Sequence, residues 1–238
     1  MNYLASIIPT QRSVIDLTTP IIVIPFLDFA LCKIFSTKSR WFQLHSVING
    51  IIVYIIYDDI INIFSNPLEN IGTINSKMDS CFIMILHIYH LLIVKQLTMM
   101  DYFHHIVFVG LGVIPSIVYY NNNLIRLAWL PSCGLPGCIE YFTLSLVKHD
   151  KLASIRQKRI NSYVYNYIRY PLTVIGPTIT YVAYKNNLLP NTNGFILLYF
   201  NCILFFNGAF YNKITIENYI LHKYKRNNSF HNLQGIHG

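Results

Sequence analysis

Charged residues are scarce in this sequence: they make up 12% of its 238 residues, against about 25% in an ordinary soluble domain. So few charges cannot cover a soluble globule of this size, and 53% of the residues are hydrophobic. The formal charge of +8 does not indicate nucleic acid, because Lys and Arg occur in short loops between apolar runs, where they act as a topology signal. The composition predicts a multi-pass membrane protein whose partners are membrane lipids, with no nucleic acid.

Other features are missing as well. The five cysteines show no metal-ligand spacing, and Cys133 and Cys138 are expected to be small packing residues. There is no internal repeat, no coiled-coil pattern and no long linker, and the apolar runs lack the alternation of β-barrel strands. The N-terminus carries no cleavable signal, so the first apolar run is expected to be a retained span. We expect no metal and no tightly bound cofactor.

Long apolar segments fill most of the chain. A segment of about 20 residues crosses a ~30 Å hydrocarbon core, and seven segments near this length follow one another: Val14–Phe35, Trp41–Phe64, Asp79–Gln96, Asp101–Tyr120, Asn123–Val147, Ser162–Tyr184 and Gly194–Thr215. The sequence therefore predicts an all-α, multi-pass transmembrane bundle of about seven spans. Residues 1–40 would be an N-terminal span and loop, residues 41–217 the membrane domain, and residues 218–238 a polar tail.

The basic residues predict an orientation. With the N-terminus outside or lumenal, twelve Lys and Arg fall on the cytosolic side: Lys33, Lys38, Arg40, Lys95, Lys148, Lys151, Arg156, Lys158, Arg159, Lys223, Lys225 and Arg226. Four fall on the other side: Arg12, Lys77, Arg126 and Lys185. The positive-inside rule then places the C-terminus in the cytosol. The basic loop Lys148–Arg159 is expected to be a topology anchor, with a functional role as the alternative.

Polar groups recur at one depth. A rise of 1.5 Å per residue puts a layer of them roughly 5–12 Å below the cytosolic face: His45, His90, His105, Glu140, Arg169 and Lys213. His87 precedes His90 by three residues, and Asn49 follows His45 by four, so each pair shares a helix face. These groups are either interhelical hydrogen bonds, which contribute about 0.6–2 kcal/mol each, or the lining of a cavity that binds a lipid or substrate.

The stretch Lys95–Gly112 holds the strongest candidates for chemistry. Asp101 lies three and four residues before His104 and His105, so its carboxylate can accept an imidazole N–H and orient the ring. Adjacent residues point about 100° apart on a helix. We therefore expect one histidine to face a cavity and the other to contact a neighbouring helix.

Two further places are unusual. Pro131, Gly134, Pro136 and Gly137 interrupt the fifth span, which cannot be a smooth helix throughout. Broken backbone at membrane depth occurs where it is buried in protein or lines a cavity. The adjacent Asp58 and Asp59 lie near the opposite face and are expected to be interfacial, with an ion site as the alternative.

The order of these elements resembles the TLC-domain family, which includes the ceramide synthases. The resemblance runs from about Arg40 to Glu217. It rests on the stretches RWFQLHSVINGII (40–52), DYFHHIVF (101–108), IEYFTLSLVKHDKL (139–152), NYIRYPL (166–172) and YFNCILFFNGAFYNKI (199–214).

The resemblance implies a TLC-type helical bundle in an endomembrane such as the endoplasmic reticulum. In ceramide synthases the double histidine is implicated in moving an acyl group from acyl-CoA to a sphingoid base. On that likeness His104 and His105, oriented by Asp101, would be catalytic. His45, Asn49, His87, His90, Glu140 and Arg169 would bind the lipid, and Lys151, Arg156, Lys158 and Arg159 would hold the CoA phosphates.

The chain also departs from these relatives. Ceramide synthases carry a His-Asp and a Ser-Asp after the double histidine, whereas Trp129–Glu140 contains neither Asp nor His. The alternative of a di-iron hydroxylase is disfavoured. A di-iron centre of that kind needs about eight histidine ligands, and too few of the nine histidines lie in the predicted spans. Two functions stay open: a protein that binds or handles a lipid or acyl chain in a cytosol-facing cavity, and an acyl-CoA-dependent N-acyltransferase. A homo-oligomer is compatible with either.

Overall fold

The computed structural model describes residues 11–94, 96–189 and 192–234, with side chains described as far as residue 225. Lys95, the side chain of Arg226 and the end of the expected tail lie outside the described residues. Within them the chain forms helices and no β-strand: α1 (Gln11–Phe35), α2 (Arg40–Ser65), α3 (Met78–Ile93), α4 (Met99–Phe103), α5 (Ile114–Tyr119), α6 (Ile125–Trp129), α7 (Leu135–Lys148), α8 (Ser154–Val164), α9 (Tyr170–Lys185) and α10 (Gly194–Gln234).

Three π-helical segments interrupt the longer helices. They are η2 (His104–Val113) between α4 and α5, η3 (Leu130–Gly134) between α6 and α7, and η4 (Tyr165–Arg169) between α8 and α9. The sequence predicted irregular backbone around Pro131, and η3 confirms it. π-Helical turns are rare and are frequent at functional sites.

Each of the seven apolar segments overlaps one helical rod, continuous or composite, although the third rod ends at Ile93, before the predicted end at Gln96. Four rods are long and apolar enough to cross a membrane: Gln11–Phe35, Arg40–Ser65, Met99–Tyr119 and Gly194–Lys225. Met78–Ile93 is apolar but shorter. The composite rods Ile125–Lys148 and Ser154–Lys185 are not among the four. Over the described residues the fold is therefore all-helical, with four helices long and apolar enough to cross a membrane.

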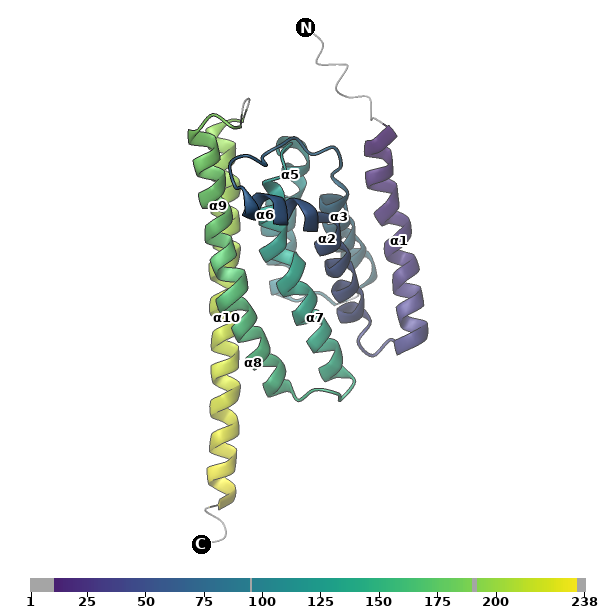
Figure 1. The fold of residues 1–238 in the computed structure, drawn as a ribbon. Helices are drawn as coiled ribbons and strands as arrows, with labels where there is room; N and C mark the ends of the chain where they lie inside the picture. Colours follow the sequence, from purple (N-terminus) through teal and green to yellow (C-terminus); the bar gives the residue numbers. More distant parts are fainter. Residues whose placement is uncertain (1–10, 95, 190–191, 235–238) are drawn as a thin grey trace.

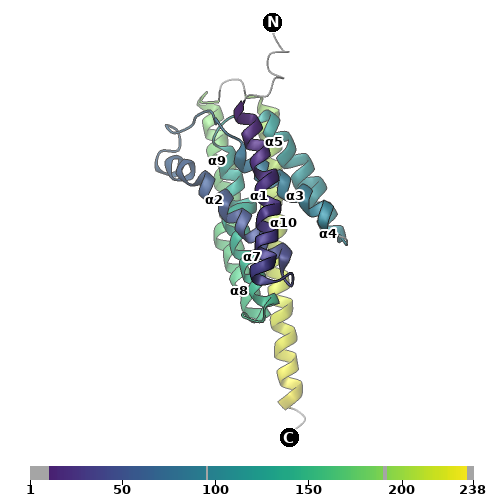
Figure 2. The same cartoon turned by 90° about the vertical axis from the view of Figure 1, so that its right-hand side faces the viewer.

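The rods run side by side along one long axis and alternate in direction (Figure 1). α1 lies at one edge of the bundle against α2 and α3, and α8, α9 and α10 form the opposite edge (Figures 1 and 2). α10 extends well beyond the other helices at the end where the chain leaves the bundle. At a rise of 1.5 Å per residue its length is about 60 Å.

The core follows the face of α2 that the sequence makes apolar. Leu44, Ile48, Ile52 and Ile56 recur every four residues and are fully buried. The next stripe on the same helix holds Trp41, His45 and Asn49, of which His45 and Asn49 are also buried. α2 therefore presents an apolar ridge and a polar ridge to its neighbours, and it packs most closely on α7.

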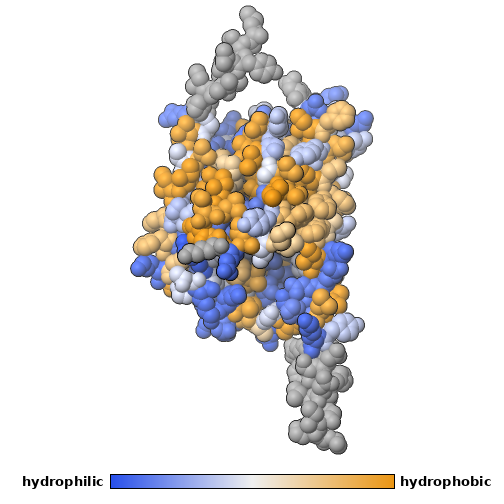
Figure 3. All heavy atoms as spheres, turned by 180° about the vertical axis from the view of Figure 1, so that it is seen from behind, coloured by the Kyte–Doolittle hydropathy of each residue, from blue (hydrophilic) through white to orange (hydrophobic). Residues whose placement is uncertain are grey.

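On the face drawn in Figure 3, hydrophobic residues form a wide band across the middle of the bundle. Tyr54, Ile22 and Phe26 are 84%, 69% and 67% exposed. Hydrophilic residues gather toward the end where α10 leaves the bundle (Figure 3). Large apolar side chains that face outward over a wide band are what a lipid environment favours and what a soluble surface avoids.

At that end the connections α1–α2 and α7–α8 are bonded to each other. The Lys38 ammonium donates to the Asp150 carboxylate at 2.7 Å, and Ser39 hydrogen-bonds the His149 ring at 2.8 Å. The hydrogen bond from Lys38 lowers the pKa of the exposed Asp150 carboxyl. Two basic loops that the sequence placed on one side of the membrane thus lie at one end of the bundle.

Backbone groups freed by prolines find partners. Pro115 has no N–H to donate to the carbonyl of Leu111. That carbonyl instead accepts a hydrogen bond of 2.8 Å from the Tyr199 hydroxyl of α10. Proline is tolerated in a membrane span because a neighbouring helix can supply the hydrogen bond that proline removes.

Close packing of α9 on α10 depends on Gly208. A Cβ at this position would clash with Oγ1 of the fully buried Thr173. We predict that Gly208→Ala lowers the free energy of unfolding by about 1–3 kcal/mol, the usual effect of overpacking. Thermal unfolding in mild detergent measures it. Gly110→Ala is the control, because its nearest atom would be the His105 carbonyl oxygen at 3.4 Å; equal losses in both variants would contradict the prediction.

Candidate functional site

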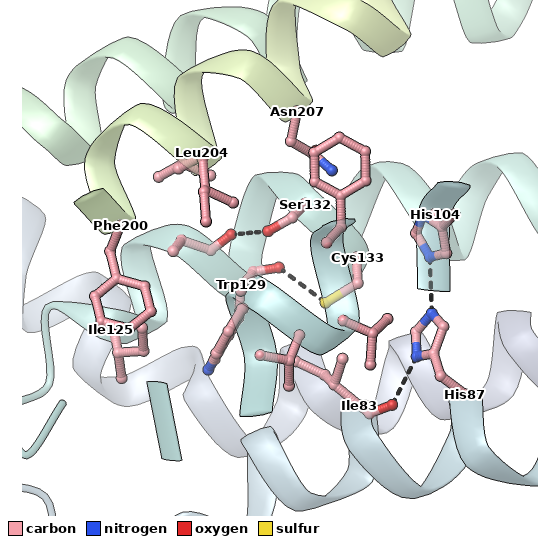
Figure 4. Close-up of a pocket in the computed structure, with 16 residues that line it drawn as sticks. Ile83, His87, His104, Ile125, Trp129, Ser132, Cys133, Phe200, Leu204 and Asn207 are labelled. Carbon is pink, nitrogen blue, oxygen red and sulfur yellow. Dashed lines mark hydrogen bonds between the residues drawn. The ribbon is translucent and has the colours of Figure 1, made fainter. Parts of the chain in front are cut away.

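A cavity of about 80 Å³ lies between α3, η2, α6, η3 and α10. Most of its wall is apolar, including Ile83, Phe108, Val113, Ile125, Trp129 and Leu204. Figure 4 shows His87 and His104 at one end and Phe200 with Ile125 at the other, while Asn207 reaches in from α10. This central cavity therefore has a polar end and an apolar end. A second, smaller cavity beside it shares Ile125, Ala128, Phe200 and Leu204.

Five histidines gather beside the polar end. His87 and His90 of α3 lie between His45 of α2 and the His104–His105 pair of η2. The ring centroids are 5.9 Å apart for His45 and His87, 5.0 Å for His87 and His104, and 5.0 Å for His90 and His105. Trp41 packs on both His45 and His90, with centroids 3.8 and 3.7 Å away. The depth calculation predicted that His45, His90 and His105 lie level, and this histidine cluster confirms it.

Hydrogen bonds define the tautomers within the cluster. His87 Nδ1 lies 2.6 Å from the Ile83 carbonyl oxygen, which can only accept, so Nδ1 carries the proton. In a neutral ring Nε2 of His87 is then an acceptor, and it faces Nε2 of His104 at 3.0 Å. His104 must donate through Nε2 and accept through Nδ1, which lies 2.9 Å from the Tyr211 hydroxyl. A directed chain thus runs from Tyr211 through His104 and His87 to Ile83.

His105 is different. Its Nδ1 donates to the Asp101 carbonyl oxygen at 2.6 Å, while its Nε2 is buried without a hydrogen-bond partner. As predicted for adjacent histidines, one faces the cavity and the other a neighbouring helix: His104 lines the central cavity, and His105 faces His87 and His90 on α3. His105 therefore keeps a free lone pair, whereas both nitrogens of His104 are occupied.

A second polar network joins the cluster through Tyr211. Arg169, 4% exposed, donates from Nη1 to the Tyr165 hydroxyl and from Nη2 to Asn207 Oδ1, both at 2.7 Å. The Tyr165 hydroxyl donates to the Glu140 carboxylate. The guanidinium also lies over the rings of Tyr165 and Tyr211, 4.6 and 5.0 Å from their centroids. Glu140 and Arg169 thus belong to one arginine network, which spans α7, η4 and α10.

The expectation for the Asp101 side chain was wrong. Its carboxylate accepts from the Thr98 backbone N–H and hydroxyl, each at 2.7 Å, and Thr98 in turn accepts from the Asp101 N–H. This capping box forms because the helix begins at Met99, two residues before the predicted start. Asp101 orients His105 only through its backbone carbonyl.

Other predicted residues lie apart from the cavity. Lys213 is exposed and pairs with Glu217 at 3.9 Å, so it does not join the polar layer. Lys151, Arg156 and Arg159 are exposed at the α7–α8 end of the bundle, where Arg159 donates to the Tyr219 hydroxyl at 3.4 Å. Lys158 is partly buried, and burial lowers the pKa of its ammonium. Asn49 is buried, and its amide lies against Gly137 of α7.

Asp28, Tyr165, Asn207 and Tyr211 escaped the sequence analysis, whereas Arg126, Asp58 and Asp59 were named in it. Asp28 of α1 is buried and accepts from Arg40 and from the Tyr89 hydroxyl. At the far end of the bundle Arg126 pairs with Asp79 and with Asp59, while Asp58 is exposed. Only a weak sequence pattern could have predicted the partners of Arg169 and His104. Tyr165 lies one helical turn before Arg169, and Asn207 lies one helical turn before Tyr211.

Within the described part of the chain, no three His, Cys, Asp or Glu side chains are arranged to hold a metal ion. The described cysteines are all free. Comparison of this chain with protein-family models, with curated proteins and with solved structures finds no match. The geometry of the cavity and of its two networks is therefore the basis for a function.

The capping role of Asp101 generates a prediction. Thr98→Ala and Asp101→Ala should each lower the free energy of unfolding by about 0.5–2 kcal/mol, the usual effect of losing a cap. The double variant should lose little more than either single one, because the two residues form one interaction. A double-mutant cycle by thermal unfolding in mild detergent tests this. Fully additive losses would show that Asp101 acts elsewhere.

Proposed function

We propose that this chain is a lipid-handling membrane protein that binds an acyl chain in the central cavity. The observation that carries the proposal is the polarity of the cavity, with His87, His104 and Asn207 at one end and Phe200 at the other. Buried hydrocarbon is stabilised by an apolar wall, and a few convergent polar groups set its orientation. At about 80 Å³ the cavity suits a segment of one slender chain and is too small for a whole lipid. The adjoining smaller cavity would extend that chain.

We also propose the family and the membrane topology of the chain. On the motifs given above, the chain is a TLC-type protein with seven spans in an endomembrane. Its N-terminus is lumenal or outside and its C-terminus is cytosolic, and the cavity opens toward the cytosol. Support comes from the alternating direction of the rods and from the basic loops that share one end of the bundle. The histidine cluster lies on α2, α3 and η2. The motifs at residues 40–52 and 101–108 lie on the first and the last of these rods.

Cysteine labelling tests the topology. In a variant without native cysteines, Glu69→Cys and Lys185→Cys should react with a membrane-impermeant maleimide from the lumenal or outer side. Gln96→Cys and Lys151→Cys should react only from the cytosol. All four positions are exposed in connections or at helix ends. Reaction of Gln96→Cys or Lys151→Cys on the same side as Glu69→Cys would refute the alternation of seven spans.

A second candidate is an acyl-CoA-dependent N-acyltransferase. The specific observation in its favour is the buried, unpartnered Nε2 of His105, since a lone pair in that position can take a proton from an attacking amine. His104 is the weaker base because Tyr211 and His87 occupy both its nitrogens. The exposed Lys151, Arg156 and Arg159 with the half-buried Lys158 would then hold the CoA phosphates.

Lipid mass spectrometry on protein purified in mild detergent tests the proposed function. We predict a co-purifying lipid in the wild type and at least about a tenfold loss, equivalent to roughly 1.4 kcal/mol, in Ala128→Phe, which fills the cavity wall. Leu111→Phe is the matched control, because Leu111 is half exposed on the outer surface. Equal lipid content in both variants would refute binding in this cavity.

Acyl-CoA and a long-chain amine added to the same samples separate the two candidates. A new acylated amine made by the wild type and not by His105→Ala would establish the transferase. Bound lipid that is never converted to a product would support the lipid-binding protein.

A further inference from the structure

Arg169 has unused hydrogen-bonding capacity in a place where water cannot reach it. The residue is 4% exposed, and its Nε N–H has no hydrogen-bond partner. A guanidinium carries five N–H groups in a fixed fork. This guanidinium makes two hydrogen bonds, one to the Tyr165 hydroxyl and one to Asn207 Oδ1. A buried N–H without an acceptor is costly, so such a group points to a missing acceptor.

The charge of Arg169 is also incompletely balanced. Among the described residues it forms no ion pair with Asp or Glu; Glu140 is reached only through the Tyr165 hydroxyl. Glu140 interacts electrostatically with Lys158 as well, so one carboxylate serves two cations. The aromatic faces of Tyr165 and Tyr211 stabilise the guanidinium but bring no negative charge. One positive charge at this depth therefore has no counterion of its own.

Asn207 connects this charge to the central cavity. Its Oδ1 accepts from Arg169 Nη2, so its amide nitrogen is left to donate, and the residue lines the cavity (Figure 4). His104, the other polar group at that end, interacts electrostatically with Arg169. A head group at the polar end of the cavity would thus meet an amide N–H backed by a buried cation.

We infer that the cavity takes a single-chain amphiphile with an anionic head, and specifically the carboxylate of a long-chain fatty acid. This rests on the proposed function and names its ligand class. The carboxylate accepts from the Asn207 amide and supplies the counterion that Arg169 lacks, and the hydrocarbon lies along Trp129 toward Phe200. Arg169 does not line the cavity and acts on the carboxylate through Asn207, and a carboxylate is the smallest lipid anion for a cavity of about 80 Å³. Neutral lipids with the same chain bring no counterion and bind more weakly.

Trp129 provides a direct readout, because it lines the cavity and is one of two tryptophans. The wild type in mild detergent is titrated with stearate brominated at mid-chain and with the brominated alcohol of the same length, and quenching of tryptophan fluorescence is followed. A Trp129→Phe variant, which retains only Trp41, identifies the quenching that comes from the cavity. The acid should bind about tenfold to a hundredfold more tightly than the alcohol, the range for hydrogen bonds to a charged group.

Arg169→Gln should remove that preference and leave the affinity for the alcohol unchanged. Arg12→Gln, a control on the exposed surface of α1, should keep the preference. Equal binding of acid and alcohol by the wild type would overturn the inference and leave the proposed function standing, and this comparison needs no variant to fold. Quenching by neither ligand would instead remove the proposed function. A saturated lysophosphatidate that displaces the acid more effectively than unlabelled stearate does would overturn the carboxylate assignment in favour of a phosphate.

Discussion

A guanidinium that is almost fully buried in an apolar bundle needs acceptors and aromatic faces around it, and in this chain that group is Arg169. Tyr165 and Asn207 accept its N–H groups, and Tyr211 lies against its face. These contacts tie η4 to α7 and α10. Because Tyr211 also bonds His104, the same set of contacts continues into η2 and α3. The relative register of these helices therefore depends on one buried charge.

The three π-helical segments contain residues of this network and of the cavity wall. His104 and His105 begin η2, Cys133 of the cavity wall belongs to η3, and Arg169 ends η4. A π turn widens the helix and rotates the residues that follow, so it changes which side chains face the interior. Near Pro131 the missing N–H removes a regular α-helical hydrogen bond in any case. Irregular backbone and the polar interior thus coincide around one cavity.

A polar interior of this kind serves packing and, in the proposed function, binding as well. The chain from Tyr211 to Ile83 is fully paired and specifies how α3, η2 and α10 meet, as interhelical hydrogen bonds do in membranes. His105 Nε2 and Arg169 Nε are buried in the same layer and are not paired. Groups of the first kind are explained by the fold alone. Groups of the second kind are not explained by the pairing of the helices, and one of them, Arg169 Nε, is an observation from which the ligand is proposed.

The sequence by itself determined the helical class, the approximate positions of the helices and the common level of His45, His90 and His105. Those properties depend on local composition and on the constant rise of a helix, which are readable along the chain. Only the tertiary structure decided that Asp101 caps a helix, that Lys213 points outward, and that Tyr165, Asn207 and Tyr211 complete the network. Such choices depend on where a helix begins to within a residue or two and on how neighbouring helices are rotated. Both are set by packing between segments far apart in sequence, and no local pattern records them.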